Sequence, residues 1–215
     1  MLQPSIFFNK AKQRICLFSV AMLISSLALQ SAAHSQSKAV ASAKAPMEVS
    51  AFGQGAVWQM QGTGALRFLG FKAYDANLWT TGTGKANPLA EKSVFALEIV
   101  YNTAIKADEI VNVSLIEMAR LKKPTDAQIK NWTADLQRTF PSVVQGDRLT
   151  GVYIPKVGTR FFFNSRLIAE INDPSFGDAF FAIWLDEGTK RGELRRQLLG
   201  QPSSEIARPA SGAMN

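Results

Sequence analysis

The sequence predicts an α+β fold in which one open-faced, largely antiparallel β-sheet is covered on one face by a layer of helices. Two blocks of short segments rich in β-branched and aromatic residues are each broken by glycine or asparagine turn signals. Two segments with helical periodicity lie between these blocks, and two more follow the second block. Strands and helices that gather in separate stretches are typical of the α+β class. The other face of the sheet is expected to be open to solvent.

The N-terminus is predicted to be a secretory signal peptide that spans residues 1–35. Three basic residues precede an apolar run over residues 15–29, which is too short to span a bilayer. Small residues follow, and Ala33-His34-Ser35 fits a cleavage site. A retained membrane anchor is the alternative.

Three further regions are expected after the signal peptide. Residues 36–47 are rich in Ala, Ser and Lys and are predicted to be a flexible tether. Residues 48–200 form the predicted folded domain, and the Ser- and Pro-rich residues 201–215 are predicted to be a disordered tail. The mature chain is expected to be periplasmic or secreted.

Cleavage near Ser35 would remove the single cysteine and the single histidine, Cys16 and His34. The mature chain would then hold no disulfide, no Cys/His nucleophile pair and no His- or Cys-based metal site. No cofactor is therefore expected. The signal peptide carries three of the 24 basic residues and none of the 17 acidic ones, which leaves a modest mature net charge of +4. With no long basic run, nucleic acid is not an expected partner.

The first strand block is predicted to hold four strands. Residues 51–60 and 65–68 read as two early strands with a turn at Gly62–Gly64 between them. Residues 72–80 form a stronger strand, and residues 94–101 are so apolar that burial on both faces is expected.

Two helices are predicted to follow this block. Apolar residues of the segment 108–121 cover more than half of a helical circumference. Such a helix either packs on two sides or forms the wall of a cavity. A capping-box pattern from Thr125 to Gln128 begins the second helix, and Pro141 ends it.

The second strand block is predicted to contain hairpins over residues 149–154, 159–163 and 166–171. Asp173 is a candidate N-cap because proline follows it at the first helical position. The helix after it is strongly aromatic. Thr189 is the predicted cap of a last helix.

The order of motifs along the chain resembles the chalcone isomerase-like family, and within it the bacterial branch that carries signal peptides. The resemblance covers roughly residues 48–200, and it implies a sheet of six or seven strands under a helical layer, with a pocket between them. The segments that carry it are Gly62–Arg67, Phe71–Trp79, Leu97–Tyr101, Thr139–Pro141, Gly146–Arg148, Phe180–Leu185 and Leu194–Gly200.

The resemblance implies two different uses of that pocket. In the plant flavonoid enzymes it holds a chalcone whose phenolic oxygen closes a ring, whereas a plastid branch binds fatty acids with an arginine and a tyrosine on the carboxylate. Arg67 matches the family arginine, and Tyr74 falls where the fatty-acid binders have tyrosine and the isomerases have threonine. Ala107 lies nearest the isomerases' catalytic tyrosine, and this departure counts against isomerase activity.

The chemistry of these side chains favours a site for an acidic amphiphile. A guanidinium group grips a carboxylate through two hydrogen bonds, and a nearby tyrosine hydroxyl adds a third. Arg67 and Tyr74 are therefore expected to meet at the closed end of an apolar pocket. The predicted lining residues are Leu115, Met118, Phe180 and Trp184. The alternatives are an exposed ion pair for Arg67, a packed side chain with a satisfied hydroxyl for Tyr74, and a plain core role for the aromatic residues.

Three functional hypotheses remain open at the level of sequence. The first is a non-catalytic periplasmic protein that binds a small lipophilic or amphiphilic acid, such as a fatty acid. The second is an isomerase of the chalcone-flavanone type, which is an intramolecular lyase. The third is an interaction protein that contacts envelope components and holds no ligand.

Overall fold

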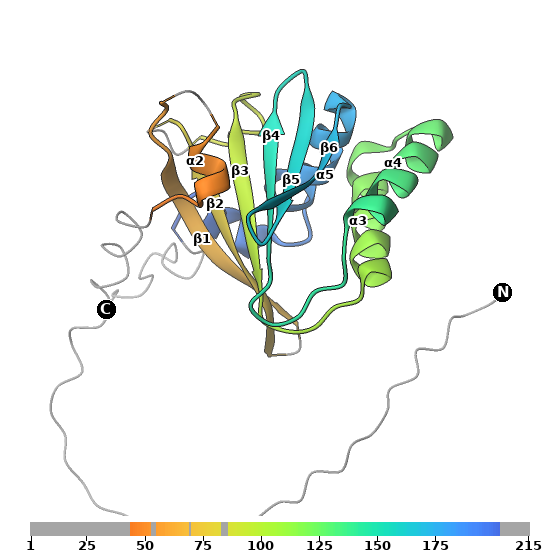
Figure 1. Cartoon of the computed structure of the whole chain (residues 1–215), viewed down its shortest axis with the longest axis horizontal. Helices are drawn as coiled ribbons and strands as arrows, with labels where there is room; N and C mark the ends of the chain where they lie inside the picture. Colours follow the sequence, from red (N-terminus) through yellow and green to blue (C-terminus); the bar gives the residue numbers. More distant parts are fainter. Residues whose placement is uncertain (1–43, 53–54, 69, 83–85, 203–215) are drawn as a thin grey trace, which may run out of the picture. The chain divides into compact units, whose positions relative to one another are not determined.

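The computed structural model describes residues 44–52, 55–68, 70–82 and 86–202 (Figure 1). The expected signal peptide lies outside the described residues, as do most of the expected tether and tail. In the described part of the chain, no helix has both the length and the apolar character needed to cross a membrane.

In the described residues, a single sheet of six strands forms the centre of the fold, and its strand order is the same as the order of the strands in the chain. Every neighbouring pair is antiparallel. The predicted α+β class with an antiparallel sheet is confirmed. The strands are β1 (Gln59–Phe68), β2 (Phe71–Thr80), β3 (Phe95–Tyr101), β4 (Arg148–Ile154), β5 (Gly158–Phe163) and β6 (Arg166–Ile171).

The helices begin where local capping chemistry favours them. The side chain of Thr125 and that of Gln128 form the predicted capping box at the start of α4. At the start of α5, the Asp173 carboxylate accepts a hydrogen bond of 2.8 Å from the backbone nitrogen of Ser175. The described helices are α2 (Met47–Ser50), α3 (Ala107–Lys122), α4 (Asp126–Thr139), α5 (Pro174–Leu185) and α6 (Gly192–Leu198).

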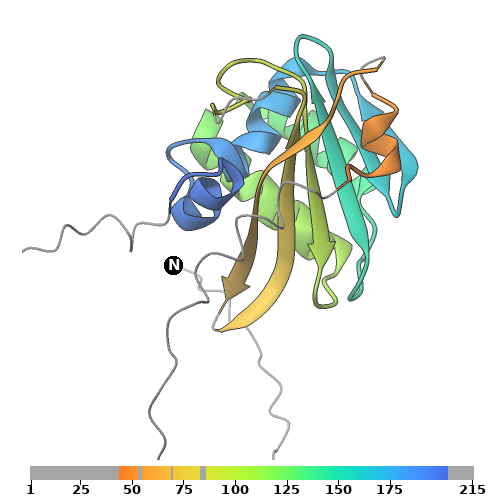
Figure 2. The ribbon, with the colours of Figure 1, turned by 90° about the vertical axis from the view of Figure 1, so that its left-hand side faces the viewer.

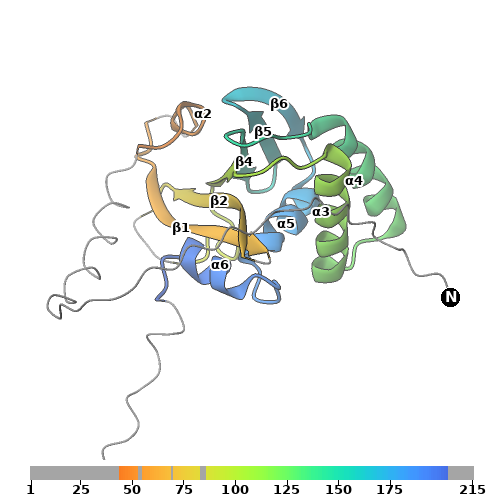
Figure 3. The same ribbon diagram turned by 90° about the horizontal axis from the view of Figure 1, so that it is seen from below.

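Helices α3 to α6 enclose the main core against one face of the sheet, as Figures 2 and 3 show. The opposite face of the open sheet is covered only in part, by residues that precede β1. There the helical turn α2 and the residues around it cover a second apolar cluster that includes Val49, Trp58 and Trp79. Alternating side chains of a strand point to opposite faces, so Trp79 requires cover on the side away from the main core.

The start and the continuity of strand β1 differ from the sequence-based prediction. Residues 51, 52 and 55–58 are not part of a strand. Phe52 and Trp58 pack onto the second face of the sheet, where Trp58 Nε1 donates a hydrogen bond of 2.7 Å to the Phe52 carbonyl. The glycines at 62 and 64 lie within a continuous strand instead of a turn. A Cβ atom on Gly62 would lie 2.1 Å from the Gln197 carbonyl oxygen, so this glycine allows α6 to pack directly on β1.

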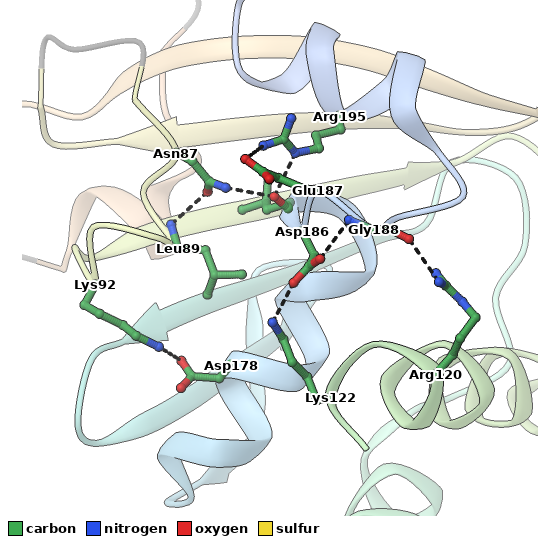
Figure 4. A network of polar contacts seen from close by, with 11 residues as sticks. Asn87, Leu89, Lys92, Arg120, Lys122, Asp178, Asp186, Glu187, Gly188 and Arg195 are labelled. Atoms are coloured by element: carbon green, nitrogen blue, oxygen red, sulfur yellow. Dashed lines mark hydrogen bonds and ion pairs between the residues drawn. The ribbon is translucent and has the colours of Figure 1, made fainter. Parts of the chain in front are cut away.

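The C-terminal end of α5 is held by the network drawn in Figure 4. The Leu185 carbonyl accepts hydrogen bonds from Asn87 Nδ2 at 2.8 Å and from Arg195 Nε at 2.9 Å. Asp186 pairs with Lys122 of α3. The last turn of α5 is thereby joined to the β2–β3 connection, to α3 and to α6. This matters for the site, because α5 supplies one of its walls.

Candidate ligand-binding site

A cavity of about 300 Å³ lies between the sheet and helices α3 and α5. This volume is at the lower end of the range found for small-molecule sites. Most of its lining is apolar, and the polar groups are few. It is lined by Leu66, Ala73, Tyr74, Ile99, Tyr101, Ile105, Glu109, Ile110, Val113, Ser114, Glu117, Phe140, Leu149, Phe180, Ile183, Trp184, Thr189 and Arg191.

The main polar contact in the cavity joins Tyr74 of β2 to Trp184 of α5. Trp184 Nε1 donates a hydrogen bond of 2.9 Å to the Tyr74 hydroxyl oxygen. Among the described residues no acceptor is recorded for the hydrogen of that hydroxyl, which leaves it available to a ligand oxygen. Burial raises the pKa of Tyr74 to about 12, and the Trp184 hydrogen bond and the Arg191 charge offset only part of the rise. The hydroxyl is therefore a neutral donor at physiological pH.

Tyr101 places a second phenol in the same cavity. It is the register partner of Tyr74, and the two rings meet edge to face with centroids 6.1 Å apart. Burial raises its pKa as well, and the neighbouring Tyr74 adds to the rise. Both phenols are therefore protonated near neutral pH, where they can donate hydrogen bonds but cannot act as bases.

Arg191 supplies the positive charge of the cavity. It is the residue before α6, and its side chain is exposed at the edge of the cavity. The Arg191 charge lowers the pKa of the Tyr74 hydroxyl, but burial raises that pKa by more. No described acidic residue lies within ion-pair distance of Arg191. A cation and a neutral donor on one cavity suit a carboxylate.

Two carboxylates also line the cavity. Glu117 pairs with Arg120 at 2.6 Å and with Lys190 at 3.1 Å. Burial of Glu117 favours a raised pKa, but the hydrogen bonds from these two cations outweigh it and lower the pKa. Its charge is thus already neutralised by neighbours. Glu109 is exposed in the first turn of α3, where the helix dipole favours a negative charge.

Three of the six residues expected at the site line the cavity, namely Tyr74, Phe180 and Trp184. Leu115 and Met118 do not, which corrects the expected lining. Met118 is fully buried in the core, and Leu115 packs half-buried against that core. The stripe of α3 that faces the cavity is instead Ile110, Val113, Ser114 and Glu117, which follow one another at helical spacing. Because α3 is apolar around most of its circumference, sequence could not select between these adjacent stripes.

Arg67 also lies apart from its expected position. It is exposed and lines a separate groove, which it shares with Lys190 and Arg191. Leu66, the preceding residue of β1, lines the cavity, and successive side chains of a strand point to opposite faces, so Arg67 is directed away from the lining. On the partner strand, Leu66 pairs with Tyr74 but Arg67 pairs with Lys72, so Ala73 is the additional residue of a bulge. The bulge explains why two adjacent residues of β2, Ala73 and Tyr74, both line the cavity.

Sequence reasoning missed Arg191 and Tyr101 as cavity residues. Tyr101 carried a usable signal, because it is the last residue of a buried strand and Ile99, two positions earlier, shares its face. Arg191 carried none, since it lies in a polar connection between two helices. That connection folds back onto α5 through a hydrogen bond of 2.6 Å from the Thr189 hydroxyl to the Ile183 carbonyl.

Comparison with known proteins places this architecture in a family. The family model described as chalcone isomerase-like matches residues 37–200. The chain belongs to the chalcone isomerase-like family. The comparison of this chalcone isomerase-like chain with curated proteins found no match.

Among the solved structures similar to this chalcone isomerase-like protein is the fatty-acid binding protein of Arabidopsis thaliana. The match has a TM-score of 0.55 and 9% sequence identity, and it covers 67% of this chain and 88% of that chain. At such low identity the likeness shows a common fold alone.

In this chalcone isomerase-like protein, the polar contact of Ala107 is made by its backbone. It is the first residue of α3, and its backbone nitrogen donates a hydrogen bond of 3.0 Å to the Ser142 hydroxyl. The side chain offers no hydroxyl to a substrate at this point. The phenols that do reach the cavity, Tyr74 and Tyr101, come from the sheet.

Proposed function

We propose that this protein is a non-catalytic member of its family that binds a small lipophilic acid, such as a fatty acid, in the cavity between sheet and helices. The acyl chain lies against the apolar walls, and the carboxylate is held by the Tyr74 hydroxyl and the Arg191 guanidinium. The observation that carries the proposal is the free hydrogen of the Tyr74 hydroxyl beside an arginine with no described ion-pair partner.

The size and lining of the cavity support an acyl chain of medium length. A volume of about 300 Å³ is at the small end of the range for ligand sites, which favours a medium chain over a long one. Each methylene that leaves water contributes about 0.8 kcal/mol. Phe180, Ile183 and Trp184 of α5 offer a continuous apolar surface for such a chain. A longer chain would extend out of the cavity past the exposed Val113.

The head of the ligand is assigned to Arg191 and Tyr74 because the other charged groups of the cavity do not suit it. Glu117 already has two cationic partners, and Glu109 would repel a carboxylate. Arg67 lies outside the lining, and in this proposal it makes no direct contact with the ligand.

Absence of turnover is supported by the state of the two phenols. Their raised pKa values keep them protonated, and residue 107 is alanine. The proposal places the protein in the bacterial secreted branch of the family and in the periplasm, after cleavage near Ser35. Three basic residues before an apolar run of about fifteen residues support that location.

The test is a fluorescence titration of the chain from residue 36 onward with decanoate and, as a matched uncharged ligand, decanol. Trp184 borders the cavity, so its emission reports binding, and Trp184→Phe identifies the signal among the four tryptophans. Decanoate is expected to bind at least tenfold more tightly than decanol, a difference of about 1.4 kcal/mol. Equal affinities, or no binding of either, would contradict the proposal.

A chalcone added to the same protein tests the absence of turnover. The expected rate of ring closure is the rate in buffer alone. Rapid closure that is lost in Tyr74→Phe would overturn the non-catalytic part of the proposal and favour an isomerase.

A further inference from the structure

The hairpin of β1 and β2 ends in an exposed aromatic side chain. Phe71 is 81% exposed, at the first position of β2. Figure 1 shows this hairpin reaching the bottom of the view, at the end of the sheet where the chain also enters α3. The same hairpin contributes Leu66, Ala73 and Tyr74 to the cavity wall. The exposed aromatic residue is therefore only a few residues from the cavity.

Two arginines lie beside this hairpin without an acidic partner at ion-pair distance in the described chain. Arg67 of β1 and Arg191 before α6 line one groove. The neighbouring lysines, in contrast, have acidic partners: Lys72 pairs with Asp75 at 2.8 Å, and Lys190 pairs with Glu117 at 3.1 Å. Arg67 attracts Asp75 only at longer range. The positive charges of Arg67 and Arg191 are thus available to an external anion.

We propose that Arg67, Phe71 and Arg191 form a docking surface for an anionic lipid bilayer. The three residues are called the hairpin surface below. Phe71 enters the bilayer at the level of the headgroups and Arg67 contacts the lipid phosphates, as Arg191 does while no carboxylate occupies the cavity. An aromatic side chain with adjacent cations is the usual composition of a surface that binds membranes peripherally. The attraction of each such cation to an anionic bilayer changes affinity about fivefold.

Arg191 connects the hairpin surface to the cavity, because it lines both the groove and the cavity. Docking would therefore bring the cavity to the layer in which lipophilic acids are dissolved. This purpose depends on the proposed function, whereas the docking itself depends only on the exposed aromatic residue and the unpaired charges. A bilayer is favoured over a protein partner because the described side chains of this surface offer two cations without an ion-pair partner and one exposed aromatic anchor, which is less than a protein interface requires.

The chain offers a matched control at the other end of β1. Val57 precedes the strand and is 71% exposed, so it is comparable to Phe71 in exposure. A strand of ten residues at about 3.3 Å per residue separates the two positions by roughly 30 Å. Substitution of Val57 removes exposed apolar surface without touching the hairpin surface.

The experiment is flotation of the chain from residue 36 onward with vesicles of phosphatidylcholine alone or of phosphatidylcholine and phosphatidylglycerol in equal parts. Wild type is expected to float with the anionic vesicles and not with the neutral ones. Phe71→Ser should weaken binding about tenfold and Arg67→Gln about fivefold. Val57→Ser should bind as wild type does.

Three outcomes would overturn docking on a bilayer: no flotation with anionic vesicles, equal losses in Phe71→Ser and Val57→Ser, or Phe71-dependent capture of a protein in place of vesicles. Decanoate titration of Phe71→Ser and Arg67→Gln in vesicle-free buffer separates this inference from the proposed function. Normal decanoate binding without flotation contradicts docking alone. Flotation without decanoate binding contradicts the proposed function alone.

Discussion

The indole nitrogen of Trp184 donates a hydrogen bond of 2.9 Å to the hydroxyl oxygen of Tyr74, and this bond joins helix α5 to strand β2. It satisfies the only polar atom of a buried tryptophan side chain. It also fixes the direction of the hydroxyl, because an oxygen that accepts from one side presents its hydrogen elsewhere. One contact therefore stabilises the fold and prepares the cavity for a ligand acceptor.

Removal of the Tyr74 hydroxyl is expected to lower both stability and affinity. Tyr74→Phe leaves Trp184 Nε1 without its acceptor, at a cost of about 1–3 kcal/mol in the free energy of unfolding. Decanoate affinity should fall about tenfold, since one hydrogen bond to a charged group is lost. Urea unfolding and the fluorescence titration measure the two effects. A variant as stable as wild type would show that the bond contributes nothing.

Tyr101→Phe is the matched control within the same cavity. Within the described part of the chain the Tyr101 hydroxyl has no hydrogen-bond partner, so its removal leaves no partner unsatisfied and should change the free energy of unfolding by less than about 0.5 kcal/mol. If this variant loses as much stability as Tyr74→Phe, the Trp184 contact is not the cause of the effect.

The three tyrosines of the chain are expected to resist ionisation in the folded protein. Burial raises the pKa of Tyr74 to about 12 and raises those of Tyr101 and Tyr153 as well. An unfolded tyrosine titrates near 10. Because the folded pKa values are the higher ones, their contribution to stability is complete below pH about 10 and is lost as pH rises toward 12.

Ultraviolet absorbance of the phenolate, recorded against pH, checks this prediction. The native protein should show almost no phenolate at pH about 10, whereas the protein in urea should show about half of its full signal. A native curve that coincides with the urea curve would contradict the prediction.

If Arg191 binds the ligand carboxylate, substitutions of Arg191 and Arg67 should have different effects on decanoate affinity. Arg191→Gln should reduce decanoate affinity about tenfold or more, because it removes a charge-assisted contact. Decanol affinity should hardly change. Arg67→Gln should leave both affinities as they are, since Arg67 does not line the cavity. The reverse result would restore Arg67 as the carboxylate ligand.

Packing of α6 on β1 is expected to depend on Gly62. In Gly62→Ala the new Cβ would lie 2.1 Å from one backbone oxygen and 2.4 Å from another, so α6 would have to move. We expect a loss of about 1–3 kcal/mol in the free energy of unfolding. Gly82→Ala is the matched control, because nothing lies within 4 Å of a Cβ at that position. Equal stabilities of the two variants would show that α6 adjusts freely.

The fold could be predicted from sequence where local chemistry determines structure. The capping box at Thr125 and the Asp173-Pro174 pair fixed the starts of α4 and α5, and strand periodicity located β2 to β6 within one or two residues. The start of β1 and the role of Gly62 were missed. Glycine between apolar residues signals a turn and a close backbone approach equally well, and the approaching helix lies 130 residues further along the chain.

The site was predictable only in part. Tyr74 shares the parity of Ala76 and Leu78, which face the main core, so its direction follows from the strand period. A single extra residue at Ala73 then breaks that alternation in β2 and places Ala73 on the cavity beside Tyr74, while Arg67 alternates with Leu66 and lies outside the lining. Neither this bulge nor the return of the Thr189–Arg191 segment onto α5 is encoded by a local pattern.

The sheet adds its strands in the order in which they occur along the chain, and this has a consequence for assembly. Each strand can pair with the preceding one as soon as it becomes available, without a wait for distant sequence. The helices that close the aromatic side of the core, α5 and α6, come last. A chain that stops before Pro174 would carry a complete sheet with Phe95, Tyr153 and Phe161 uncovered, which makes premature termination an aggregation hazard for this architecture.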